Sequence, residues 1–245
     1  MEIEVYETKE QMGQRAADYA AEGLNTTIQE KGEANLILAT GASQFEMLEA
    51  LTQKNVEWGK VTCFHLDEYV GMDDSHPASF CGYLRERFEE QIPTPVNAFH
   101  YVDGMAEDPE AECRRLGDII RDHPIDVACI GIGENGHLAF NDPPADFETE
   151  EPFIVVELNE ECRRQQLGEG WFQTLEDVPK KAISMSIKQI MKSDRLVVTC
   201  PDERKADAVK RTVNEKVSNE CPATVLRQHP ECILFLDENS ASKLE

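Results

Sequence analysis

Short apolar runs alternate with longer segments of helical periodicity along most of the chain. Apolar runs bounded by turn residues are typical of buried strands. They predict strands over 35–39, 61–66, 127–130, 153–157, 182–187, 195–199 and 231–236. Residues 2–6 alternate apolar and polar side chains, which predicts an edge strand, and a short strand is expected near 97–102. Helical spacing predicts helices over about 9–31, 77–90, 108–121 and 201–213.

Capping residues mark where several of these helices begin and end. Thr8 precedes the first helix and Gly32 follows it, as expected for an N-cap and a C-terminal stop. Ser43 is followed three residues later by Glu46, the spacing of a capping box, which predicts a helix that begins at this point.

The alternation of strands and helices predicts an α/β fold. We expect a single domain over 1–245, built on a doubly wound, mostly parallel sheet with helices on both faces. Residues 159–176 are polar and contain two glycines next to Trp171, so they are the candidate lid; an ordinary helical excursion is the alternative.

Composition narrows the classes of partner. The net charge of −24 and the absence of a basic stretch argue against nucleic acid, and an anionic substrate would need a local focus of N–H groups and a few cations. No apolar run is long enough for a membrane span, and Met1–Glu4 lacks a secretory signal. We therefore expect a cytoplasmic protein that does not bind membranes. The sequence is compatible with a homo-oligomer.

The eight cysteines indicate the redox state but no metal site. They are scattered and form no CxxC pair, which favours reduced thiols over a disulfide framework. Their spacing does not match a structural zinc site, so we expect no metal. No dinucleotide fingerprint is present either, so we expect no cofactor.

A glycine-rich loop follows the predicted strand 127–130. It carries His137, with Asn135 two residues before it and Asp142 five residues after it. An imidazole flanked by an amide and a carboxylate is suited to proton transfer. A simple turn with a structural histidine is the alternative for such a loop alone.

Two further strand ends carry polar residues of the same kind. Asp67 and Glu68 follow the predicted strand 61–66, and adjacent side chains in an extended segment point to opposite sides. We expect Asp67 to face the site as a proton-transferring base, the alternative being a structural carboxylate. Because open α/β sheets bind ligands at the carboxyl ends of their strands, three such loops together predict a site.

The third strand-end loop, Thr40-Gly41-Ala42-Ser43, is the candidate phosphate site. A helix that begins after it would offer free N–H groups to an anion. Ser43 could donate to phosphate or serve only as a cap. The loop lacks the lysine of a nucleotide P-loop. Lys205, near the start of another predicted helix, is the candidate cation, although such a residue is often only solvated.

Taken together, the motifs resemble the glucosamine-6-phosphate deaminase/isomerase family, within a superfamily that includes 6-phosphogluconolactonases. They are Leu38–Gly41, Leu66–Gly71 and Gly133–Pro143, in the family's order over nearly the whole chain. Tyr69 and the residues after Gly136-His137 resemble those of the deaminase branch. The lactonase branch generally carries different residues at these positions.

The resemblance implies conversion of glucosamine 6-phosphate to fructose 6-phosphate and ammonia, without a metal or cofactor. It implies phosphate binding at Thr40–Ser43 with Lys205, ring opening by His137 and proton transfer between C2 and C1 by Asp67. A sugar-phosphate lactonase would not need Asp67 as a carbon base, and a sugar-phosphate sensor would release no ammonia; both stay as alternatives.

The sequence departs from the family pattern at several positions. Asn135 stands where an aspartate is usual, and Asp142 where a glutamate is usual. Ala42 and Gln44 replace a glycine and a proline of the first loop. The expected phosphate-binding arginine of the lid has no clean counterpart, although Arg163 and Arg164 lie nearby. Asp142 is then the acid of this motif that is expected to support His137.

Overall fold

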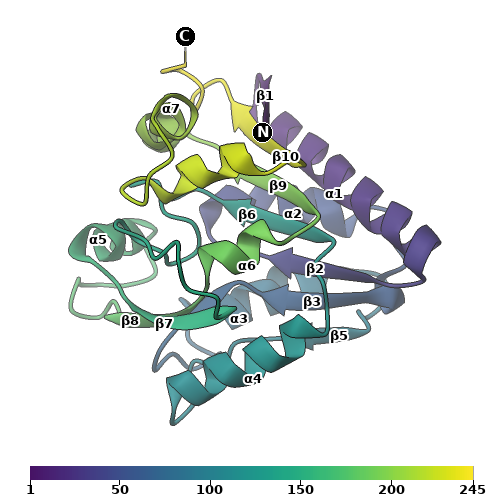
Figure 1. Cartoon of the computed structure of the whole chain (residues 1–245), viewed down its shortest axis with the longest axis horizontal. Helices are drawn as coiled ribbons and strands as arrows, with labels where there is room; N and C mark the ends of the chain where they lie inside the picture. The colour runs from purple at the N-terminus through teal and green to yellow at the C-terminus, as the bar shows by residue number, and fades with distance from the viewer. Residues whose placement is uncertain (245) are drawn as a thin grey trace.

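The computed structural model describes residues 1–244 and contains one seven-stranded sheet (Figure 1). All neighbouring strands in this sheet run parallel, in the order β1-β10-β9-β6-β2-β3-β5. Its strands are β1 (Glu2–Tyr6), β2 (Ala34–Leu38), β3 (Val61–His65), β5 (Ala98–His100), β6 (Val127–Gly131), β9 (Arg195–Cys200) and β10 (Cys232–Asp237). The α/β, doubly wound fold is therefore confirmed, and β1 lies at an edge as predicted.

Helices cover both faces of this sheet. They are α1 (Lys9–Lys31), α2 (Phe45–Thr52), α3 (Phe80–Leu84), α4 (Pro109–Arg121), α5 (Glu160–Gly168), α6 (Ile187–Met191) and α7 (Ala206–Asn214). One core cluster contains side chains of α1 and α2, and another contains side chains of α4, α6 and α7. Strand β2 serves both, since Leu36 and Leu38 join the first cluster and Ile37 joins the second. This alternation follows from the period of two along a strand.

Several helix ends lie where the sequence predicts them. The Thr8 side chain accepts a hydrogen bond from the N–H of Gln11, and α1 ends at Gly32. Asp108 caps α4 in the same way. The helix expected from residue 77 begins later, at Phe80, because Ser79 is the residue whose side chain caps it; it continues as a π-helical turn over Arg85–Glu89.

The acidic segment after β3 was expected to be a loop, but it forms a short strand. Asp67–Tyr69 forms a strand, β4, of a separate antiparallel sheet in the order β4-β8-β7. Its partners are β8 (Lys181–Met185) and β7 (Phe153–Glu157), and Asp67 pairs with Ser184. In Figure 1 this small sheet and α5 lie together at one side of the large sheet. The expected strand 182–187 ends earlier, since Ile187 begins α6.

The cysteine side chains lie inside the fold. All eight cysteines are free and buried. Burial raises the pKa of every one of these thiols. None of the helices within residues 1–244 is long and apolar enough to cross a bilayer.

Candidate active site

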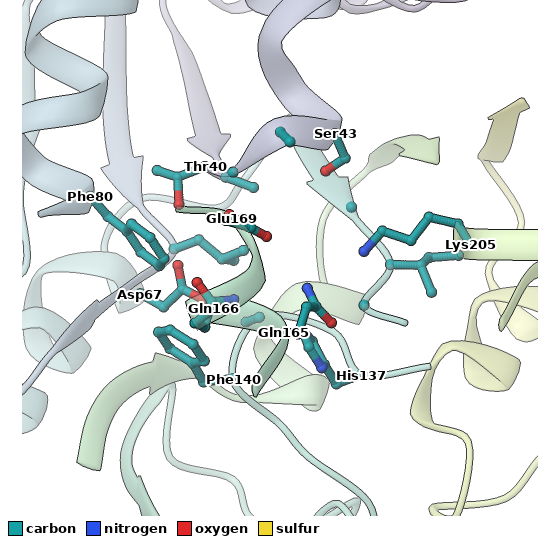
Figure 2. A pocket seen from close by; sticks show the side chains of 18 of the residues that line it. Thr40, Ser43, Asp67, Phe80, His137, Phe140, Gln165, Gln166, Glu169 and Lys205 are labelled. Carbon is teal, nitrogen blue, oxygen red and sulfur yellow. The ribbon is translucent and has the colours of Figure 1, made fainter. Parts of the chain in front are cut away.

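The chain reverses its direction of winding between β2 and β6, two neighbouring strands of the large sheet. From β2 the sequence moves outward to β3 and β5, whereas from β6 it moves to β9 and β10 on the other side. The loops after β2 and β6 consequently leave in opposite directions and open a crevice at the carboxyl ends of the strands. A cavity lies there (Figure 2).

The cavity collects residues from loops that are far apart in the sequence. The candidate residues that line it are Thr40, Gly41, Ala42, Ser43, Asp67, His137 and Lys205. Asn135 and Asp142 lie behind His137 rather than on the cavity wall. The aromatic rings of Phe80 and Phe140 complete the wall near Asp67 (Figure 2).

Asp67 is a buried carboxylate on β4 and faces the cavity. Only 5% of its surface is exposed, and burial, with a further contribution from the charge of Glu68, holds its pKa well above the ordinary value. Glu68 points away, as expected for its neighbour in a strand. It accepts hydrogen bonds from the Ser79 hydroxyl at 2.8 Å and from the N–H of Cys81 at 2.9 Å. Burial raises the pKa of Glu68 as well, and these donors oppose the shift.

His137 is held by an amide and a carboxylate on the side away from the cavity. Its Nδ1 lies 2.8 Å from Asn135 Oδ1 and 3.4 Å from Asp142 Oδ1. Asn135 also donates to Asp142 at 3.3 Å, and Asp142 accepts from the N–H of Asn159 at 3.1 Å. Burial alone would raise the pKa of Asp142, but the hydrogen bond and charge of His137, with the other donors, bring it below its ordinary value. Asn135 is thus the nearer partner and Asp142 the charged one.

The loop after β2 is shaped by hydrogen bonds that the sequence did not suggest. The capping-box prediction for Ser43 and Glu46 is wrong, because residues Ala42–Gln44 form a 3-10 turn before α2 begins at Phe45. Ser43 Oγ instead accepts from Gln44 Nε2 at 3.2 Å. Gln44 Nε2 also donates to Thr199 Oγ1 at 2.8 Å, and Thr199 donates to the Ser43 carbonyl at 2.9 Å. This network ties the loop to β9.

Lys205 reaches the cavity from the 3-10 turn that precedes α7. It is 7% exposed, so it does not lie on a solvated helix face. Figure 2 shows its ammonium directed toward the cavity on the same side as Ser43. Its neighbour Arg204 also lines the cavity and lies 3.5 Å from Glu134.

The candidate lid contains helix α5, which Asn159 caps by accepting from the N–H of Cys162. It contributes Gln165, Gln166 and Glu169 to the cavity, and no motif in the sequence marks these residues. Gln166 accepts a hydrogen bond of 2.7 Å from the hydroxyl of the buried Tyr69. Periodicity carries no signal for such polar residues; their position within the candidate lid is the one hint.

Both arginines of α5 point elsewhere. Arg163 donates to the carbonyl of Val178 at 3.0 Å, and Arg164 pairs with Glu160 at 2.6 Å on the exposed face. Trp171, the large apolar residue of the candidate lid, is 40% exposed and is not among the residues that line the cavity; Phe172 is buried against Tyr69 instead.

Among residues 1–244, one group of side chains has the spacing of potential metal ligands. Atoms of His137, Asp142 and Cys162 all lie within 4.8 Å of one another. His137 Nδ1, however, is already within hydrogen-bond distance of Asn135. Burial raises the pKa of the Cys162 thiol, and Asp142 adds to this effect, which disfavours the thiolate that a metal would require.

Comparison with known proteins decides the family. The family of glucosamine-6-phosphate isomerases and 6-phosphogluconolactonases matches residues 7–234. The chain belongs to this family. A glucosamine-6-phosphate deaminase of Staphylococcus epidermidis is 36% identical over 232 residues, which cover 92% of this chain and 94% of that protein. One from Lacticaseibacillus paracasei is 31% identical and covers 100% of this chain and 99% of its own.

Solved structures of the family share the fold. A structure described as a monomeric glucosamine-6-phosphate deaminase has a TM-score of 0.90 and 32% identity, covering 99% of this chain and 100% of its own. A 6-phosphogluconolactonase from Shewanella baltica has a TM-score of 0.80, covers 97% of each chain and is 18% identical, a likeness of fold alone.

Proposed function

We propose that this family member converts glucosamine 6-phosphate and water to fructose 6-phosphate and ammonia. The observation that carries the proposal is the shared cavity of Asp67, His137, Lys205 and the loop Thr40–Ser43. A carbon base, an imidazole and an anion-binding loop are the three elements that this reaction needs. The names of the relatives described above support the same substrate.

The proposed reaction begins with the phosphate bound at Thr40–Ser43 and Lys205. Ser43 and Lys205 lie across the cavity from Asp67 (Figure 2), so a phosphate held between them would leave the reacting carbons of the sugar near the carboxylate. His137 moves the proton that opens the pyranose ring. Its second nitrogen is held by Asn135 and backed by Asp142, which fixes the orientation of the ring.

Asp67 then takes the proton from C2 and returns it to C1. Burial raises the pKa of this carboxylate, which makes it a stronger base than an exposed aspartate. The resulting imine at C2 reacts with water, so the C–N bond breaks and ammonia leaves. The route uses no metal or organic cofactor.

The test is a coupled assay for ammonia and fructose 6-phosphate, run on the parent and on Asp67→Asn. We expect both products in equal amounts from the parent, and both formed about 10²–10⁴-fold more slowly by the variant. Hydrolysis of 6-phosphogluconolactone without ammonia release would identify a lactonase, and tight binding of the sugar phosphate without turnover would identify a sensor. Either result would refute the proposal.

We also infer a cytoplasmic location. The eight free, buried cysteines support it, because a protein with so many unpaired thiols is suited to a reducing compartment. The partner is a small sugar phosphate.

A further inference from the structure

Glu169 stands where an anionic substrate group is expected to bind. It lies at the end of α5, and its carboxylate oxygen Oε2 is 3.8 Å from the position that a side-chain carbon on Gly41 would occupy. Figure 2 shows the Glu169 side chain between Thr40 on one side and Ser43 and Lys205 on the other. These are the residues to which we assign the substrate phosphate.

The surroundings of Glu169 indicate that its carboxylate interacts with Lys205, the cation that we assign to the phosphate. Burial raises the pKa of Glu169, and the charge of Lys205 is the strongest of the influences that oppose this shift, ahead of Gln165 and Arg204. Arg204 is itself next to Glu134, at 3.5 Å. Lys205 therefore faces a negative group before any substrate arrives, and neither arginine of α5 adds a positive charge.

We propose that Glu169 is a specificity-determining residue that weakens the binding of the phosphate group by competing with it for Lys205 and the loop Thr40–Ser43. The proposal rests on the proposed function, since it assumes that phosphate binds at this loop. A phosphate dianion and a carboxylate repel each other in a partly buried site, so binding requires Glu169 to move away or lose its charge.

The backbone on either side of Glu169 is loosely packed. Glu169 lies between Gly168 and Gly170, and a side-chain carbon added at either glycine would meet no atom of the described residues within 4 Å. Gly170 has a φ of +89°, which favours glycine. Movement of this short backbone segment upon binding would therefore break few contacts, and the free energy that it consumes would appear as a higher KM.

The experiment compares the parent with Glu169→Gln, which keeps the shape and removes the charge. Removing one unit charge beside a partly buried anion site should strengthen binding by about tenfold. We expect KM for glucosamine 6-phosphate and the inhibition constant of inorganic phosphate to fall by similar factors, with the change mainly in KM rather than in kcat. Discrimination against unphosphorylated glucosamine should increase, which a purely structural effect would not cause.

A matched control is Glu161→Gln, which removes the same charge from an exposed position of α5. It should leave KM and the phosphate inhibition constant unchanged. Glu169→Ala serves as a second variant and should change both constants in the same direction as Glu169→Gln.

Two outcomes would overturn the inference, and each differs from failure of the proposed function. If the parent releases ammonia but Glu169→Gln leaves both constants unchanged, Glu169 does not compete with phosphate. If both constants rise, Glu169 assists binding instead. A parent that binds inorganic phosphate but releases no ammonia would refute the proposed function alone.

Discussion

An alanine at position 133 should displace the His137 ring without unfolding the protein. A side-chain carbon on Gly133 would lie 2.2 Å from His137 Cε1 and 2.3 Å from both ring nitrogens. Carbon atoms in contact are normally about 3.5–4.0 Å apart, so the ring must move by roughly 1 Å or more. Such a shift would disrupt the 2.8 Å contact between Nδ1 and Asn135.

The two consequences of this displacement differ in size. Overpacking a well-packed site costs about 1–3 kcal/mol of stability, which a domain with about 5–15 kcal/mol tolerates. Misplacing a catalytic group by 1 Å costs about 10²-fold in rate, and loss of general acid–base catalysis costs about 10²–10⁴-fold. We therefore expect Gly133→Ala to be folded and at least about 10²-fold slower.

The assay is ammonia release, measured together with the urea midpoint of unfolding. Gly59→Ala is the control, because within residues 1–244 the nearest atom to a carbon added there is the Pro95 carbonyl oxygen at 4.0 Å. It should retain both activity and stability. A Gly133→Ala variant with parent-like kcat/KM would show that the position of the His137 ring does not matter for the reaction.

Three other substitutions test the remaining roles. Asp67→Asn should reduce kcat by about 10²–10⁴-fold with little change in substrate binding, and near-normal turnover would exclude it as the base. Because burial and then Glu68 raise the pKa of Asp67, activity should fall with decreasing pH at a higher pH than for an exposed aspartate. Glu68→Gln should move this acidic limb of the pH–kcat/KM profile to lower pH; an unmoved limb would argue against coupling of the two carboxylates. Lys205→Ala should raise KM much more than it lowers kcat, and an unchanged KM would mean that another cation binds the phosphate.

The large sheet could be predicted because its strands carry their own signal. A buried parallel strand such as Val127–Gly131 is apolar along its whole length, and the structure follows the predicted strand closely. The shared cavity was also predictable in outline. Parallel strands end at one edge, so Thr40, Asp67 and His137 could be expected to meet there, whereas their chemical roles stay predictions.

The missed features depend on contacts between distant residues. Nothing local in Asp67–Tyr69 indicates a strand, because its partners Ala182–Ser184 lie more than a hundred residues away. The pattern of Ser43 and Glu46 is locally that of a cap, but Thr199 and Gln44 hold the loop in a different turn. Glu169 was missed because a glutamate in a polar segment of an acidic chain carries no distinguishing mark.

The burial of all eight cysteines links their chemistry to the opening of the fold. Their raised pKa values keep them as protonated thiols, and the core hides them from reagents in solution. Covalent labelling can therefore proceed only as fast as the protein opens, so thiol-labelling rates measure local and global unfolding directly. In the unfolded chain under oxidising conditions, the same eight thiols can form disulfides that the folded protein lacks. Heat inactivation then becomes irreversible, and the rate of unfolding sets the lifetime of the active protein.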